Sequence, residues 1–196
     1  GAGLILMFDW RAIFTVFVFF ALISTIWTGI RIQEPLRTEM RIPFQISIFK
    51  AAFLEIISIG IVRISIVTLV FSYGTLFTCI LLVQQVFDQF FGLAGSFPGW
   101  FAVIAALSAS ASFLNSMLVM KLGMRRLISA ALSVQVFLSF LMLLMFYGGI
   151  ISGGLGFGFF AFWVFSLFFQ AGLTLGNLTA LAMEPLGHIA GTAASV

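Results

Sequence analysis

Charged residues divide this chain into long charge-free runs, and those runs limit most strongly what it can fold into. Residues 12–30, 64–87 and 127–183 contain no Asp, Glu, Lys or Arg. A helix that crosses the hydrocarbon layer needs about 20 consecutive apolar residues. Because the third run is far longer than one crossing, the chain is predicted to cross a membrane several times.

The composition excludes a water-soluble domain. Hydrophobic residues make up 62% of the chain and charged residues 8%, with a mean hydropathy of +1.24. A soluble domain has about 25% charged residues, and this much apolar surface would drive association in water. We therefore predict an all-α integral membrane protein in contact with membrane lipid.

Cysteine and histidine usage excludes two common ways of stabilising a fold. The only cysteine, Cys79, cannot form an internal disulfide, and one Cys with one His cannot supply the four ligands of a structural zinc site. No metal or other cofactor is predicted, and no nucleic-acid partner. No P-loop is present, so the sequence offers no support for ATP-driven export.

Five complete crossings follow from the gaps between charges and from the positions of Pro and Gly. They are residues 12–30, 64–87, 99–120, 127–147 and 157–183. The third restarts near Pro98, and the six glycines of YGGIISGGLGFG separate the last two. The opening GAGLILMF resembles the end of an earlier helix, and the stretch from residue 189 resembles the start of a later one. No signal peptide is recognised, so we expect an internal piece of a larger polytopic protein.

Basic residues predict the orientation in the membrane. Two basic segments separated by two crossings fall on the same side, and positively charged loops are typically cytoplasmic. The opposite side carries Asp9 with Arg11, Asp88 and the glycine turn. The basic loops within residues 31–63 and 121–126 are therefore expected in the cytoplasm. Their basic residues are Arg31, Arg37, Arg41, Lys50, Arg63, Lys121, Arg125 and Arg126.

Residues 31–63 are predicted to form a cytoplasmic connector between two helical bundles. QEPLRTEMRIP suits a polar link, whereas QISIFKAAFLEIISIGIVRI sets Phe49, Phe53, Ile56 and Ile57 against charged neighbours with roughly helical spacing. That pattern is typical of a helix lying along the membrane surface. An ordinary extramembrane loop is an equally good reading of the periodicity.

Four short stretches resemble the major facilitator superfamily. DWRAIF and the QEPL that follows a crossing are similar to the two ends of the sixth helix, and KLGMRRL resembles the short loop after the eighth. The final ALAMEPLGHIAGTAASV is similar to the junction of helices ten and eleven in drug:proton antiporters of the bicyclomycin/chloramphenicol-resistance (Bcr/CflA) type. The chain thus resembles a stretch from the end of the fifth helix to the start of the eleventh.

The resemblance implies two six-helix bundles around a cavity that opens alternately to either side of a bacterial inner membrane. Residues 1–30 would end the N-terminal bundle, and residues 64–196 would form part of the C-terminal bundle. The implied partners are the missing N-terminal helices, a drug-like substrate and protons. The proton-coupling acid of the family lies in the missing helices and is assigned to no residue here.

Polar residues at membrane depth are the candidate substrate contacts, since each is costly there. The alternative for each is a hydrogen bond between helices. The resemblance implies that helices seven and ten line the cavity, which favours Tyr73, Thr75, Gln170 and Asn177. An aromatic wall would come from Phe71, Phe77, Trp163 and Phe169. Gly172 and Gly176 are interpreted as helix-packing residues.

Charged residues near the ends of the crossings form a second set of candidates. Asp88 is a possible acid at the outer mouth of the cavity, or an interfacial residue in contact with water. At the cytoplasmic junction, a break of the helix is expected at Pro185 and Gly187, and Glu184 could pair with nearby basic residues. The gating candidates are Glu184, Pro185, Gly187, Lys121, Arg125 and Arg126.

Three function classes follow. The first is secondary active transport, with proton-coupled multidrug efflux and antibiotic resistance as its leading form. The second is transport of a sugar or another metabolite, which stays open because CILLVQQVFD departs from the family's expected sequence. The third is a membrane enzyme or a non-transporting scaffold. An enzyme would need a nucleophile with a base or a metal cluster, and the sequence shows neither, so no enzyme activity is predicted. For this chain taken alone, an inactive truncated fragment stays open as well.

Overall fold

The structure is a computed structural model that describes residues 8–32 and 46–189. All regular elements in these two ranges are helices. The chain divides into two units, residues 1–45 and residues 46–196, and each is described by itself.

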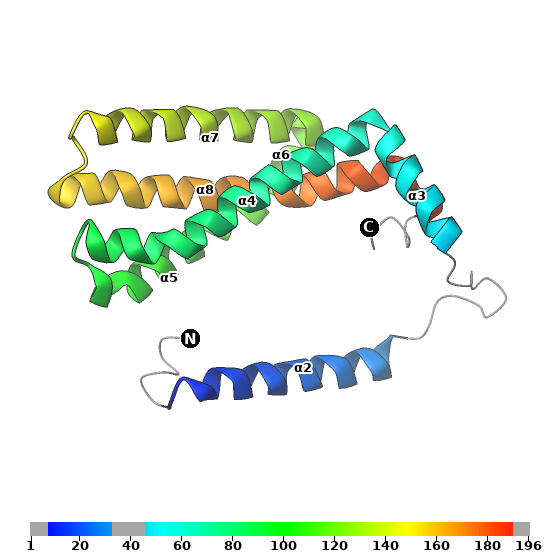
Figure 1. Ribbon diagram of the computed structural model, residues 1–196, viewed down its shortest axis with the longest axis horizontal. Helices are drawn as coiled ribbons and strands as arrows, with labels where there is room; N and C mark the ends of the chain where they lie inside the picture. Colours follow the sequence, from blue (N-terminus) through cyan, green and yellow to red (C-terminus); the bar gives the residue numbers. More distant parts are fainter. Residues whose placement is uncertain (1–7, 33–45, 190–196) are drawn as a thin grey trace. The chain divides into compact units, whose positions relative to one another are not determined.

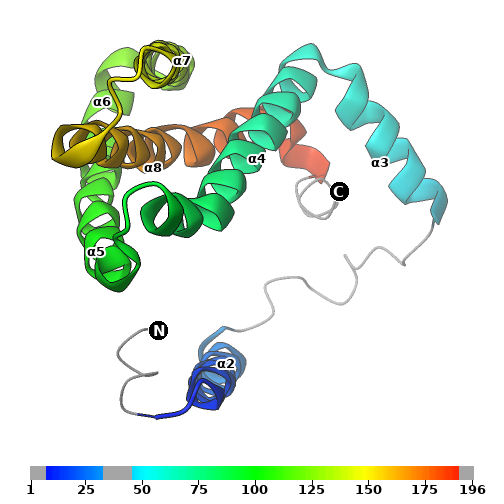
Figure 2. The same cartoon turned by 60° about the vertical axis from the view of Figure 1, so that its left-hand side comes forward.

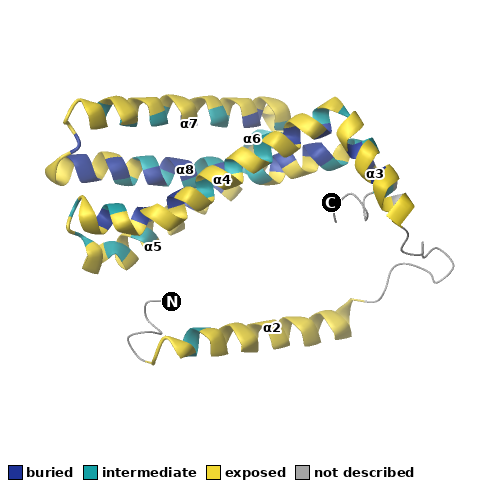
Figure 3. Cartoon of the chain, in the orientation of Figure 1, coloured by how far each residue is buried: buried dark blue, intermediate teal, exposed yellow. Residues whose placement is uncertain are grey.

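The first unit contains one helix, α2 (Arg11–Arg31), and none of its residues is buried (Figure 3). Its apolar residues surround the helix on all sides, as expected of a helix in contact with lipid. Each end carries a Trp beside an Arg: Arg11 lies 5.3 Å from the ring of Trp10, and Arg31 lies 5.8 Å from the ring of Trp27. Such aromatic and basic pairs are typical of the two membrane–water interfaces.

The second unit is a bundle whose helices run back and forth. After α3 (Ile46–Ser58) come α4 (Gly60–Gln89), a short 3-10 turn, and then α5 (Phe97–Ser108), α6 (Ser110–Leu122), α7 (Met124–Tyr147) and α8 (Gly153–Met183). A 3-10 turn, η3 (Glu184–Ile189), follows α8. Helices α5 and α6 form one candidate membrane span that is interrupted at Ala109. Helix α6 joins α7 through Gly123, whose φ of +76° only glycine adopts readily.

Helix α8 is the centre of this bundle. It lies beside α7 and α4 in both views of the molecule, and it also packs on α5 and α6 (Figures 1 and 2). The dark stripe of buried residues is densest along α8 (Figure 3). A helix that is apolar all round and buried by several neighbours is expected at the core of a bundle.

Phenylalanine side chains fill the core near the C-terminal end of α4 and the N-terminal end of α8. The fully buried ring of Phe87 meets Phe97 and Phe157 edge to face, each at 5.2 Å between centroids. Edge-to-face pairs add about 0.5–1.5 kcal/mol to the burial of the rings. These contacts tie α4, α5 and α8 together at one end of the bundle.

The five predicted crossings are confirmed, because the described residues include five helical spans long and apolar enough to cross a membrane. Three starts precede the predicted ones by three or four residues. Helix α4 begins at Gly60 rather than residue 64, so Arg63 lies in its first turn, and α8 begins at Gly153 rather than residue 157. Helix α7 begins at Met124 rather than residue 127, so Arg125 and Arg126 lie in its first turn and not in a loop. The glycine turn shrinks to residues 148–152. Gly156 lies in the first turn of α8, and only glycine fits there, because a Cβ would approach the backbone of Ile151 to 2.7 Å.

The predicted connector contains a helix in its described part. In α3, Ala52 and Ile56 are buried, and Ile56 packs with Val62, Ala182 and Leu186. The side chains of Phe49, Phe53 and Ile57 are exposed. Residues 33–45, with the QEPL motif, and residues 190–196 lie outside the described ranges. A position along the membrane surface and the bundle boundaries stay predictions.

Candidate functional site

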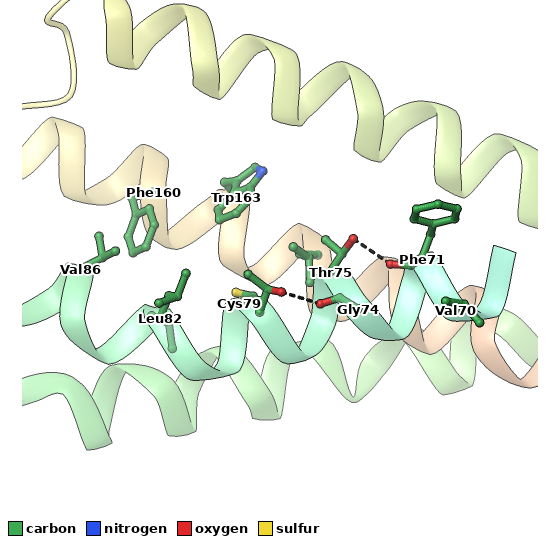
Figure 4. Close-up of a pocket in the computed structure, with 12 residues that line it drawn as sticks. Val70, Phe71, Gly74, Thr75, Cys79, Leu82, Val86, Phe160 and Trp163 are labelled. Atoms are coloured by element: carbon green, nitrogen blue, oxygen red, sulfur yellow. Dashed lines mark hydrogen bonds between the residues drawn. The ribbon is translucent and has the colours of Figure 1, made fainter. Parts of the chain in front are cut away.

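An open cavity of about 720 Å³ lies between α4 and α8 (Figure 4). Successive turns of α4 supply one wall, because residues three and four apart share a helix face. The other wall comes from Phe160, Trp163 and Leu167 of α8. A cavity of this size matches the usual range of sites for small molecules, about 300–1,000 Å³.

No charged side chain lines this cavity, and its few polar atoms are already hydrogen-bonded within the chain. Thr75 Oγ1 donates to the carbonyl of Phe71 at 2.8 Å, and Thr78 Oγ1 donates to the carbonyl of Gly74 at 2.7 Å (Figure 4). The thiol of Cys79 adds a weak donor. The wall is thus apolar and aromatic, with two hydroxyl oxygens facing it.

Trp163 is held in place from the neighbouring helix. Its indole N–H donates to Ser139 Oγ of α7 at 3.0 Å, and Gln135 Nε2 donates to the same oxygen at 3.4 Å. The Trp163 ring also lies 6.0 Å from the ring of Phe160. This arrangement orients the indole with its N–H toward α7, where it is satisfied, and leaves its ring to line the cavity.

A second cavity of about 290 Å³ continues along the other side of Trp163. It lies between α4, α7 and α8, and it shares Val86, Phe160 and Trp163 with the first. Ser139 is its polar lining residue. Trp163 therefore separates two adjoining apolar spaces.

The four predicted cavity candidates do not share one site. Thr75 lines the cavity between α4 and α8, together with the predicted aromatic residues Phe71 and Trp163. Tyr73 is 41% exposed and stacks on Phe77 at 6.2 Å between ring centroids. Thr75 and Tyr73 are two residues apart, and such residues point to different sides of a helix.

Gln170 and Asn177 do not line the α4–α8 cavity, and both donate hydrogen bonds to other residues of the bundle. Gln170 lines a third cavity of about 360 Å³ on the α6 and α7 side of α8, with the predicted aromatic residue Phe169, and donates to Thr174 Oγ1 at 2.7 Å. Asn177 is 7% exposed and donates to Asn115 Oδ1 of α6 at 2.6 Å and to the carbonyl of Leu173 at 2.7 Å. Asn177 therefore forms an interhelical hydrogen bond, the alternative weighed for each polar residue.

Sequence reasoning missed Phe160, Cys79 and Ser139 as parts of the site. A signal for the α4 wall was present, because Phe71, Thr75, Thr78, Leu82 and Val86 recur at helical spacing. Nothing in the sequence linked Ser139 to Trp163, since that contact depends on how α7 is rotated against α8.

The junction residues gather at one end of the bundle, where α4 begins, α6 ends, α7 begins and α8 ends (Figure 1). Lys121, Arg125, Arg126 and Glu184 are all exposed. Within the described part of the chain, Glu184 forms no ion pair with any of these three cations. Pro185 and Gly187 lie in η3, so α8 ends at the predicted break.

Asp88 lies in the last turn of α4, at the other end of the bundle, and is exposed.

The two predicted packing glycines of α8, Gly172 and Gly176, differ in their surroundings. A Cβ at Gly172 would lie 2.8 Å from Ala111 Cβ, whereas one at Gly176 would meet no atom within 4 Å. The close approach of α8 to α6 is therefore at Gly172. The part of the α5–α6 span nearest Gly172 is Ala111, with the carbonyl oxygen of Ser108 at 4.0 Å from the same Cβ position.

Comparison with known proteins shows sequence similarity to one protein named for drug resistance. No family model and no solved structure matches it. It is 29% identical, over an alignment of 199 residues, to the bicyclomycin resistance protein homolog of Haemophilus influenzae. The alignment covers 100% of this chain and 48% of that protein, so the chain spans about half the length of the curated relative it matches. This multi-pass membrane chain is therefore similar along its whole length to a bicyclomycin resistance protein homolog, which confirms the resemblance seen in its motifs.

Proposed function

We propose that the complete protein containing this chain is a secondary transporter that exports drugs or other hydrophobic small molecules in exchange for protons. The observation that carries the proposal is the similarity, over the whole chain, to a protein named for bicyclomycin resistance. The apolar, aromatic cavity between α4 and α8 supports it, because such walls suit drug-like molecules.

Alternating access needs two bundles that rock around a shared site. In this proposal α4 and α8 form one wall of the site, and helices outside this chain form the other and carry the proton-coupling acid. The substrate contacts would be Thr75 with the rings of Phe71 and Trp163. Tyr73, Gln170 and Asn177 would support the bundle rather than touch the substrate.

The proposed membrane is the bacterial inner membrane, with the basic end of the bundle in the cytoplasm. Arg63, Lys121, Arg125 and Arg126 all belong to the end where α4 begins and α6 ends, and Asp88 belongs to the opposite end. This separation of charge supports the orientation, since Lys and Arg in short loops are retained on the cytoplasmic side.

Export of chloramphenicol tests the function. Cells expressing the complete reading frame should accumulate less labelled chloramphenicol than cells with an empty vector, and a proton uncoupler should abolish the difference. Cells expressing only these 196 residues serve as the second control and should show no export. Export that persists with the uncoupler would contradict proton coupling, and no export of chloramphenicol or of a fluorescent cationic dye would contradict drug efflux.

A gating role of Glu184 is testable in the same assay. Glu184 is exposed and has no ion-pair partner among the described cations, so we expect Glu184→Gln to keep at least half of the export rate at equal expression. A loss of export without a loss of protein would instead assign Glu184 to the gate.

A further inference from the structure

The third cavity, of about 360 Å³, is a groove along α8 between α6 and α7. Its floor is closed, because Leu127, Ser166 and Leu173 are buried, whereas Ala130 and Val134 at its rim are exposed. Most of the lining is aliphatic or aromatic. The three polar lining residues already donate hydrogen bonds within the bundle: Gln135, Ser166 and Gln170. The groove is therefore suited to a hydrocarbon chain.

The groove has the length of one membrane leaflet. It follows α7 from Leu127, close to the start of that helix, to Leu138. These eleven positions rise by about 16 Å at about 1.5 Å per residue. One leaflet supplies half of a hydrocarbon core about 30 Å thick. An acyl chain that enters at the basic end of the bundle would thus match the groove over its whole length.

Two cations lie at the end of the groove where α6 meets α7. Arg126 precedes the lining residue Ala130 by four positions, and Lys121 follows the lining residue Leu118 by three. Residues at these spacings share a helix face. Both cations are exposed, and neither forms an ion pair within the described residues. Positive charge without a partner therefore meets the apolar groove at this end.

The first turn of α7 has the wrong charge for its own helix. The N-terminus of a helix favours anions and disfavours cations, yet Arg125 and Arg126 lie in this turn. It contains no acidic residue, and Gly123 at its N-cap provides no side-chain hydrogen bond. An anion bound here would compensate both arginines and the helix dipole.

We propose that this groove binds an anionic phospholipid of the leaflet on the basic side of the bundle. The phosphate lies at Lys121 and Arg126, and one acyl chain follows α7 and α8. A soluble anion would use the cations alone, whereas a lipid also fills the apolar groove that continues from them. Basic pockets between membrane helices are known to bind anionic headgroups. The site is independent of which molecule the protein exports.

Photolabelling of the complete protein tests the site. Nanodiscs of phosphatidylcholine would contain a small, equal fraction of either phosphatidylglycerol or phosphatidylcholine with a photoactivatable acyl chain, and mass spectrometry would quantify the labelled peptides. We expect residues 127–138 and 162–173 to be labelled at least about fivefold more by the phosphatidylglycerol probe, the effect of one cation near an anionic headgroup.

Charge variants locate the phosphate. Lys121→Gln and Arg126→Gln should each lower the ratio of phosphatidylglycerol to phosphatidylcholine labelling by about two- to fivefold. Arg63→Gln is the matched control, because it removes the same charge from the same end of the bundle, and α4 contributes no residue to the groove. It should leave the ratio unchanged.

A phenylalanine in the groove tests the position of the acyl chain. Ala130→Phe fills the rim without changing the charge, so labelling of residues 127–138 and 162–173 by phosphatidylglycerol should fall. Val136→Phe is the control on the same helix, since Val136 is exposed and does not line the groove. It should keep the labelling.

Equal labelling by the two lipids would overturn the proposal, and so would a ratio that neither Lys121→Gln nor Arg126→Gln lowers. An absence of label in the groove would also overturn it, because another helix of the complete protein would then fill that space. Since Lys121 and Arg126 are exposed, their variants decide the question even if Ala130→Phe does not fold.

Discussion

At the scale of single residues, Gly172 sets how closely α8 approaches α6. An alanine there would place its Cβ 2.8 Å from Ala111 Cβ, and overpacking of this kind costs about 1–3 kcal/mol. The higher helix propensity of alanine returns up to about 1 kcal/mol. We expect Gly172→Ala to lower the thermal midpoint in detergent, while the control Gly176→Ala, which meets open space, leaves it equal or higher. Adding Ala111→Gly to Gly172→Ala should restore the midpoint, and failure to do so would exclude this contact as the cause.

The Asn115–Asn177 hydrogen bond is the second residue-scale prediction. It joins α6 to α8 at 2.6 Å, and hydrogen bonds between membrane helices couple by about 0.6 kcal/mol on average and up to about 1.7. A double-mutant cycle with Asn115→Ala and Asn177→Ala, measured by unfolding in detergent, should give a coupling in this range. A coupling of zero would mean that the two amides do not interact in the folded protein.

The sequence pointed to polar and aromatic residues in the membrane spans but could not assign them to one cavity. Thr75 and Tyr73 are equally good candidates for substrate contact in the sequence. Only Thr75 lines the α4–α8 cavity, because the two side chains leave α4 in different directions. Asn177 looked equally suited to substrate, and its partner Asn115 lies 62 positions away in sequence. Only the packing of α6 against α8 shows that this amide is already satisfied.

At the scale of elements, α3 is docked through one narrow face. Ile56 is 3% exposed and packs on Val62, Ala182 and Leu186, whereas its neighbour Ile57 is 41% exposed. Removing a buried Ile side chain costs about 2–5 kcal/mol, so Ile56→Ala should detach α3 locally and raise the hydrogen exchange of its amides. Ile57→Ala is the matched control and should change little. Equal exchange in both variants would contradict the docked position.

The end of helix α8 was predictable from the sequence. Pro185 follows Glu184 directly, and proline removes a backbone donor and crowds the preceding turn. The helix accordingly ends at Met183 and continues as a 3-10 turn. The interruption between α5 and α6 at Ala109 was not predictable in this way, because no Pro or Gly marks it.

At the scale of the whole molecule, the orientation in the membrane is open to direct measurement. Alkaline phosphatase is active only outside the cytoplasm, so a fusion within residues 148–152 of the complete protein should be active. A fusion within residues 121–126, the matched control on the basic side, should be inactive. The reverse pattern would overturn the predicted orientation and with it the cytoplasmic position of the gating candidates.

The sequence by itself determined the class of protein, the five crossings and the positions of most turns. These depend on local properties: apolar runs must match the thickness of the membrane, and charges, Pro and Gly end them. Only the tertiary structure decided which polar residues share a cavity and which join helices. A small rotation of one helix about its axis moves a side chain from a cavity into contact with a neighbouring helix. An apolar run of nearly uniform hydropathy does not specify that rotation. Thr75 and Trp163 therefore line the same cavity because of helix packing, and the hydrogen bond to Ser139 that orients Trp163 has the same origin.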